Sequence, residues 1–203
     1  MTVYIESNFV LEQALEQEQC ESCEALVKIA GARVIRILIP AFSLGEPHIA
    51  LMHKGNEWSR FIPELRKHLS ELARSKSYQK DSPAFTELVS LVIATEDRER
   101  AQLEAAVDAL LNIAEIIPLT SEIFQEAKGF QAKFDMSFQD SVVLSSVIGH
   151  LRGAGPAESC FLNRNTKDFA DPNIRDLLDQ FGCRFFGRFD NALGFIEAHL
   201  RGR

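Results

Sequence analysis

Apolar positions along the chain alternate between short runs, typical of buried strands, and the three-to-four-residue spacing of amphipathic helices. The short runs predict five strands, over residues 3–5, 34–39, 115–117, 159–162 and 183–186. Helical spacing predicts helices between them, over 10–29, 42–53, 57–114 with an interruption near 81–83, 121–134, 172–182 and 191–200, with a further helix that opens after Ser137. Strands that alternate with helices favour an α/β fold, a parallel sheet covered on both faces.

Glycine and proline positions predict where several of these elements stop. Gly31 is expected to cap the first helix, and Pro40 to stop the second strand. Gly55-Asn56 is expected to break the helix that precedes it. Asp171-Pro172 is a favourable opening for a helix that ends at Gly182.

The stretch from about 54 to 115 is longer than a simple crossover needs, and we interpret it as a helical elaboration of a single domain, 1–203. Leu65, Leu69 and Leu72 follow helical spacing, as do Leu88, Leu91 and Val92. Its first half carries the densest positive run of the chain: Arg60, Arg66, Lys67, Arg74, Lys76 and Lys80. We predict that it guides substrate or a partner, with self-association into a homodimer the favoured partner use. A solvated face that covers the core is the alternative.

Composition and charge narrow the classes of protein to which the chain can belong, but they do not identify a function. With 203 residues, 46% hydrophobic and 25% charged, the chain can bury a sizeable core without disulfides. A formal net charge of −7 argues against broad nonspecific binding of duplex nucleic acid but is compatible with an acidic metal site that faces a phosphate. No basic segment followed by an apolar run opens the chain, and no apolar stretch reaches membrane-spanning length.

Cysteine usage points to the reducing cytoplasm. Cys20 and Cys23 form a CxxC motif, which raises zinc or redox chemistry, but a second ligand pair is missing. Both fall inside a helical pattern, so free or structural thiols are the favoured interpretation of this motif.

Acidic residues follow three of the predicted strands. Glu6 comes directly after the first strand, Glu46 lies in the helix entered from the second, and Asp168 lies just past the fourth. Because ligands bind beyond the carboxyl ends of parallel strands, these acids are expected at one edge of the sheet. Each also has a simpler explanation: a strand end for Glu6, a cap of a helix beginning near Ser43 for Glu46, and a turn or cap for Asp168.

Asp140 joins this set by a different argument. It lies on the apolar stripe of its helix, one turn before Leu144 and two turns before Val147. A carboxylate there is costly unless something positive meets it. A capping box with Ser137 explains the same acid without any site.

Converging carboxylates repel one another and become tolerable around a hard divalent cation. Mg²⁺ and Mn²⁺ prefer such oxygen ligands, and one or two of these ions could activate water and stabilise charge on a phosphodiester.

With these acids in this order, the chain resembles the PIN-domain family. The matching pieces are Tyr4-Ile5-Glu6-Ser7-Asn8, Glu46 after the second strand, Phe138-Gln139-Asp140-Ser141, and 161–169, where Asn165 is followed three residues later by Asp168-Phe169. The resemblance implies a divalent-metal ribonuclease, often the toxin of a toxin–antitoxin pair, with RNA as substrate and an antitoxin protein as partner. It implies Glu6, Glu46, Asp140 and Asp168 as catalytic metal ligands, with Asn165 as a supporting polar residue.

Two features depart from the family pattern. Glu6 stands where the family usually has Asp, which lengthens that ligand by one methylene. The helical stretch 54–115 is longer than in compact toxin members, which puts the toxin role in doubt more than the fold.

Several residues beside the acids have two interpretations each. Asn8, with Ser7, either orders the first carboxylate or caps a helix. Arg164 and Lys167 either hold substrate phosphates or are solvated loop charges. Two further functions stay open: a PIN-like RNA-binding or interaction module with weak or lost activity, and a different metal-dependent phosphohydrolase.

Overall fold

The computed structural model, which describes residues 1–155 and 158–202, contains a five-stranded sheet in which every pairing is parallel. The strands run in the order β3-β2-β1-β4-β5. Their bounds are Thr2–Tyr4 (β1), Arg36–Pro40 (β2), Glu115–Ile117 (β3), Ser159–Leu162 (β4) and Cys183–Phe186 (β5). Each predicted strand is present, so the α/β prediction is confirmed.

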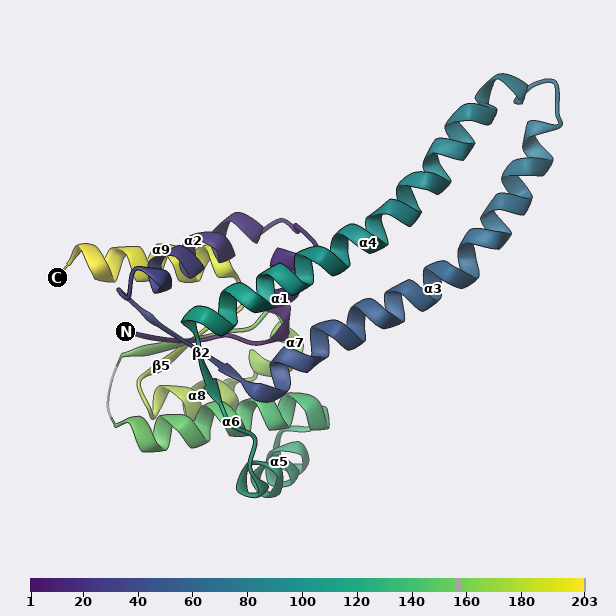
Figure 1. Cartoon of the computed structure of the whole chain (residues 1–203). Helices are drawn as coiled ribbons and strands as arrows, with labels where there is room; N and C mark the ends of the chain where they lie inside the picture. The colour runs from purple at the N-terminus through teal and green to yellow at the C-terminus, as the bar shows by residue number, and fades with distance from the viewer. Residues whose placement is uncertain (156–157, 203) are drawn as a thin grey trace.

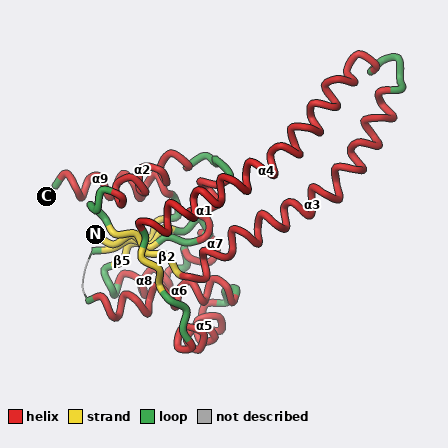
Figure 2. Tube along the Cα trace, viewed as in Figure 1, coloured by secondary structure: helices red, strands yellow, loops and turns green. Residues whose placement is uncertain are grey.

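Helices cover both faces of this sheet (Figures 1 and 2). They are α1 (Ser7–Ala14), α2 (Cys20–Gly31), α3 (Ala41–Ala73), α4 (Ser82–Ile113), α5 (Ser121–Phe134), α6 (Phe138–Ala154), α7 (Thr166–Phe169), α8 (Pro172–Asp179) and α9 (Phe189–Arg201). Strand side chains alternate between two cores. Val3 and Ile37 pack with α1, α2, α4 and α9, whereas Tyr4, Leu38 and Phe161 pack with α6 and α8.

Helices α3 and α4 form an antiparallel arm that extends away from the sheet and its covering helices (Figure 1). A short 3₁₀ turn, Gln79–Asp81, precedes α4 at the tip. The inner end of α4 belongs to the body, because Leu103 and Leu110 are fully buried in the first core. The arm therefore corresponds to most of the predicted elaboration 54–115. That residues 1–203 form a single domain stays a prediction.

The predicted break at Gly55-Asn56 is wrong, because α3 continues through it from Ala41 to Ala73. Gly55 is buried where α4 passes close by: a Cβ built there would lie 2.7 Å from an Oε of Glu96. On the preceding residue, Lys54 pairs with Glu99 of α4 at 2.5 Å. A glycine within a helix costs about 1 kcal/mol, and packing against a neighbouring helix offsets a cost of that size.

Residues in the left-handed region set two boundaries that spacing missed. The predicted pattern over 10–29 is divided into α1 and α2 near Glu16, whose φ is 47°. Gly31 is the last residue of α2 rather than its cap; Ala32 is the cap, and the following residue, Arg33, has φ of 59°. Gly182, with φ of 66°, turns the chain from α8 into β5 as its position predicted. Within the described residues, no helix has the length and hydropathy needed to span a membrane.

Candidate acidic site at the carboxyl edge of the sheet

Glu6 lies two residues beyond the end of β1 and caps the start of α1. One of its oxygens, Oε2, accepts hydrogen bonds from the backbone N–H of Asn8 at 3.0 Å and from the hydroxyl of Ser7 at 2.8 Å. The side chain is nearly fully buried, and its other oxygen, Oε1, has no hydrogen-bond partner among the described residues. Burial raises the pKa of Glu6 to about 7; the bonds from Asn8 and Ser7 oppose the rise, and the charge of Glu46 adds to it.

Glu46 lies near Glu6, Ser7 and Asp140. Burial raises the pKa of Glu46, the Ser7 hydroxyl opposes that rise, and the charge of Asp140 adds to it. The alternative interpretation of Glu46 as a cap is wrong, because α3 begins at Ala41 and its N-cap is Pro40, which makes no side-chain capping bond. Glu46 is half-buried in the second turn of α3, facing the acids of neighbouring elements.

Asp140 and Asp168 are held by one amide. The Nδ2 of Asn165 donates to Asp140 at 3.2 Å and to Asp168 at 2.8 Å. Asn165 is fixed because it caps α7: its own N–H donates to Asn163 at 2.7 Å, and its Oδ1 accepts from the N–H of Asp168. Asn165 thus positions two carboxylates, and its supporting role at a metal site stays a prediction.

Asp140 both caps the start of α6 and lies beside the other acids. Its N–H donates to the Ser137 hydroxyl at 3.0 Å, and its Oδ2 accepts from that hydroxyl at 2.6 Å, so the predicted cap is confirmed. Its second oxygen, Oδ1, is the one that meets Asn165. Capping uses one face of the carboxylate and leaves the other toward the sheet edge.

The structure therefore brings the four acids near one another, with one pair bridged by hydrogen bonds. Asn165 bridges Asp140 and Asp168, Ser7 donates to Glu6, and Glu46 lies close enough to Ser7, Glu6 and Asp140 for their charges and dipoles to act on one another. They come from the N-cap of α1 and from the opening turns of α3, α6 and α7, and α1, α3 and α7 follow β1, β2 and β4. Among the described residues, however, no three His, Cys, Asp or Glu side chains are grouped closely enough to form a preassembled metal site.

The donor chemistry of these residues fits a hard divalent cation. All four are carboxylates, two have raised pKa values in part because of their neighbours, and Glu6 holds a buried oxygen that no described protein donor satisfies. A cation would relieve both penalties. Because Mg²⁺ keeps several waters and binds through few carboxylates, a closed three-carboxylate cage is not required.

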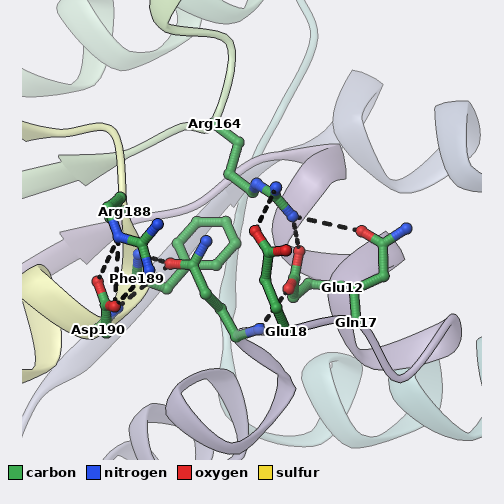
Figure 3. Close-up of polar contacts among 8 residues, drawn as sticks. Glu12, Gln17, Glu18, Arg164, Arg188, Phe189 and Asp190 are labelled. Atoms are coloured by element: carbon green, nitrogen blue, oxygen red, sulfur yellow. Dashed lines mark hydrogen bonds and ion pairs between the residues drawn. The ribbon is translucent and has the colours of Figure 1, made fainter.

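Arg164, predicted to hold substrate phosphate, is occupied by the protein itself (Figure 3). Its guanidinium pairs with Glu12, and with Glu18 at 3.0 Å, while Gln17 accepts from it at 3.3 Å. Glu12 is fully buried and also accepts the backbone N–H of Gln19 at 2.6 Å. Phosphate binding by Arg164 stays a prediction, but these contacts favour a structural role.

The same network reaches a third loop. Gln19, itself buried, accepts from the backbone N–H of Phe189 at 2.6 Å. Glu12 and Gln19 thereby join α1, the loop before α7 and the start of α9. A cleft of about 490 Å³ lies on this network and includes Asn8 and Asn165, which hold the acids. Sequence reasoning missed Glu12; its signal was its place among Phe9, Val10 and Ala14 on the buried side of α1.

The remaining candidates lie at the surface or in the core. Lys167 is exposed on α7, next to Asp168. Cys20 is half-buried and Cys23 is buried in α2, both as free thiols. Burial raises the pKa of both thiols, Cys20 to about 11, so neither is predisposed to the thiolate that zinc or redox chemistry needs.

Comparison with known proteins identifies one domain family. A family model described as PIN domain matches residues 3–169. A solved structure of VapBC2 from Rickettsia felis bound to a DNA fragment from their promoter is similar to this chain at a TM-score of 0.45 and 13% identity, over 92% of this chain and 99% of that one. None of the curated proteins compared with the sequence matches it.

Proposed function

Since the chain belongs to the PIN-domain family, we propose that it is a ribonuclease dependent on Mg²⁺ or Mn²⁺, acting at Glu6, Glu46, Asp140 and Asp168. RNA is the proposed substrate, and hydrolysis of a phosphodiester bond the proposed reaction. The single observation that carries the proposal is the Asp140–Asn165–Asp168 bridge, with Glu46 and Glu6 nearby, at the carboxyl edge of a parallel sheet, where such folds bind ligands.

The roles of individual residues follow from their contacts. When bound, the divalent cation would supply an activated water and stabilise charge on the phosphodiester. Glu6 offers its unpartnered Oε1, while Ser7 and Asn8 fix its other oxygen. Asn165 holds Asp140 and Asp168 in one orientation, so that neither carboxylate has to reorganise during the reaction. Lys167, exposed beside Asp168, is the positively charged residue that we assign to binding a substrate phosphate.

A second function is a PIN-like module that binds RNA or a partner protein with weak or lost nuclease activity. Two observations favour it: Glu6 in place of the usual Asp, and the lack of a preassembled three-ligand group among the described residues. In a toxin–antitoxin pair, the partner would be an antitoxin protein. Tight RNA binding without turnover distinguishes this function from the first.

The test is cleavage of a mixed RNA pool with added Mn²⁺ or Mg²⁺, and with EDTA. Metal-dependent cleavage that Asp140→Asn abolishes supports the ribonuclease. Binding without cleavage supports the module. Hydrolysis of small phosphate esters but not of RNA would point to a different phosphohydrolase.

A further inference from the structure

The cleft of about 490 Å³ beside the acids is large enough to hold one nucleotide, since pockets for small ligands span about 300–1,000 Å³. It adjoins the proposed catalytic site, because two of the residues that line it also contact the acids. The backbone N–H of Asn8 donates to Glu6. The Nδ2 of Asn165 bridges Asp140 and Asp168. An RNA strand with one phosphate at the acids can therefore place a neighbouring nucleotide in the cleft.

One wall of this cleft is apolar and has no role in the core. Leu11 in α1 and Leu15 at its C-cap line the cleft, one helical turn apart and so on one face of the helix. Both side chains are half-buried, and neither belongs to the two apolar cores of the described chain. Asn8 lies on the same face, one turn before Leu11. Such a wall suits the flat face of a nucleobase, since enzymes hold extruded bases between aromatic or apolar side chains.

Charge at the polar end of the cleft favours an uncharged group over a phosphate. The guanidinium of Arg164, which lines this end, is already paired with the carboxylates of Glu12 and Glu18 (Figure 3). One positive charge against two negative charges leaves this end of the cleft net negative, so it does not attract a further anion. The neutral base of a nucleotide meets no such repulsion.

The same end of the cleft offers hydrogen-bond donors that the protein leaves free. The guanidinium of Arg164 carries more N–H groups than its bonds to Glu12, Gln17 and Glu18 occupy. Gln17 accepts from Arg164 through its Oε1, which turns its Nε2 group away from the guanidinium, and among the described residues that group has no acceptor. Such donors pair with the carbonyl oxygens of uracil or guanine, whereas the edge of adenine presents an amino group and no carbonyl.

We propose that this cleft binds one unpaired base of the RNA strand, next to the bond that is cleaved, and that it prefers uracil or guanine to adenine. The inference rests on the proposed function, because it takes RNA as the ligand of the neighbouring acids. Leu11 and Leu15 contact the face of the base. Gln17 and Arg164 donate to its carbonyl edge. A base that is stacked and paired in a duplex cannot enter, so the cleft also requires a single strand at this position.

The test compares the binding of labelled oligouridine and oligoadenosine of equal length to the full chain, measured by fluorescence anisotropy. Binding is measured in Ca²⁺, a hard cation that accepts oxygen ligands, and in EDTA, with a gel to show that the oligomers stay intact. The wild type is expected to bind oligouridine about 5–10-fold more tightly than oligoadenosine, the effect of one or two hydrogen bonds to a base edge. Because binding is measured rather than cleavage, the test does not depend on turnover.

Three variants with unchanged circular dichroism spectra assign this preference to the cleft. Gln17→Glu replaces the donor with an acceptor in a side chain of the same size, and should move the ratio of the two affinities toward oligoadenosine. Leu15→Ala should weaken both oligomers alike, by about 3–10-fold, because it removes apolar contact with the face of any base. Glu16→Gln is the matched control: its residue adjoins Gln17 in the same loop but pairs with Arg98, so the wild-type ratio should remain.

Failure of this base site and failure of the ribonuclease give different results. RNA cleavage by a wild type that binds the two oligomers equally or prefers oligoadenosine overturns the base site and leaves the ribonuclease standing. A wild-type ratio that persists in Gln17→Glu, or that Glu16→Gln shifts equally, also overturns it, as does a chain that binds neither oligomer. Binding that prefers oligouridine and depends on Gln17, without metal-dependent cleavage, supports the base site and refutes the ribonuclease.

Discussion

Replacing Arg164 with Met removes the only cation that the described structure places on a fully buried carboxylate, Glu12. Methionine keeps most of the side-chain length and volume, so the change is mainly one of charge. Glu12 would retain the bond from the Gln19 N–H but lose its counter-ion. A buried charge left without its partner is among the most destabilising of single changes.

The expected loss can be bounded from the exposure of the two partners. Breaking a buried ion pair by removing one partner costs about 3–5 kcal/mol. Glu12 has no exposed surface, but the Arg164 side chain is 32% exposed, so water screens part of the interaction. We therefore expect Arg164→Met to lose about 2–4 kcal/mol of unfolding free energy. For a domain of this size, this corresponds to a fall in Tm of roughly 4–16 °C.

Urea unfolding followed by circular dichroism measures this loss, and Arg98 supplies the control. Arg98 pairs with Glu16 at 2.5 Å, but these two side chains are 66% and 52% exposed, so Arg98→Met should cost under about 1 kcal/mol. Glu12→Leu combined with Arg164→Met should recover much of the stability, because no buried charge is left unpaired. If Arg164→Met were no more destabilising than Arg98→Met, the Glu12–Arg164 pair would not be what holds these loops together.

Three further predictions concern the acids and the arm. Asp140→Asn should abolish cleavage while the chain stays folded, and without metal it should be at least as stable as wild type by thermal unfolding, because it removes a repulsive charge from a group of acids; unchanged RNA turnover in the folded variant would rule out a catalytic role. With EDTA present, the unfolding free energy of the wild type should fall by at most about 3 kcal/mol as the pH rises from about 4.5 through 7, because the pKa of Glu6 is higher in the folded chain than in the unfolded chain. The pH profile of Glu6→Gln should lack this component, and parallel profiles would contradict the argument that burial raises the pKa of Glu6. Reversing Arg60, Arg66 and Arg74 to Glu should weaken RNA binding and flatten its salt dependence by roughly 0.7 in log–log slope for each phosphate that the arm no longer neutralises; an identical slope would leave these bases a structural role.

Strands and body helices could be predicted from the sequence because each depends on local pattern. The prediction delimits β4, 159–162, correctly, since all four of its side chains are buried and three of them are apolar in succession. The continuation of α3 through Gly55 could not be predicted, because it depends on the packing of α4 from about 40 residues further along the chain. Local signals for a break were present, and a tertiary contact overrode them.

The acids could be chosen from the sequence, but their arrangement could not. Topology explains why Glu6 and Asp168 share an edge, since β1 and β4 are adjacent and parallel. The bridge of Asn165 between Asp140 and Asp168, and the bond of Ser7 to Glu6, depend on side-chain directions that no spacing encodes. Arg164 illustrates the same limit: its type and position suggested phosphate, and only the fold brings Glu12, 152 positions earlier, against its guanidinium.

The central claim, a metal-dependent ribonuclease at the acidic edge, is tested most directly by cleavage of a labelled RNA pool by the wild type and Asp140→Asn. Both proteins are purified alike, shown to be folded, and assayed with Mn²⁺, with Mg²⁺ and with EDTA. Cleavage by the wild type that requires the metal, is lost in EDTA and is lost in Asp140→Asn is the predicted result. Cleavage that persists in EDTA, or equal cleavage by the two proteins with metal, would contradict the account.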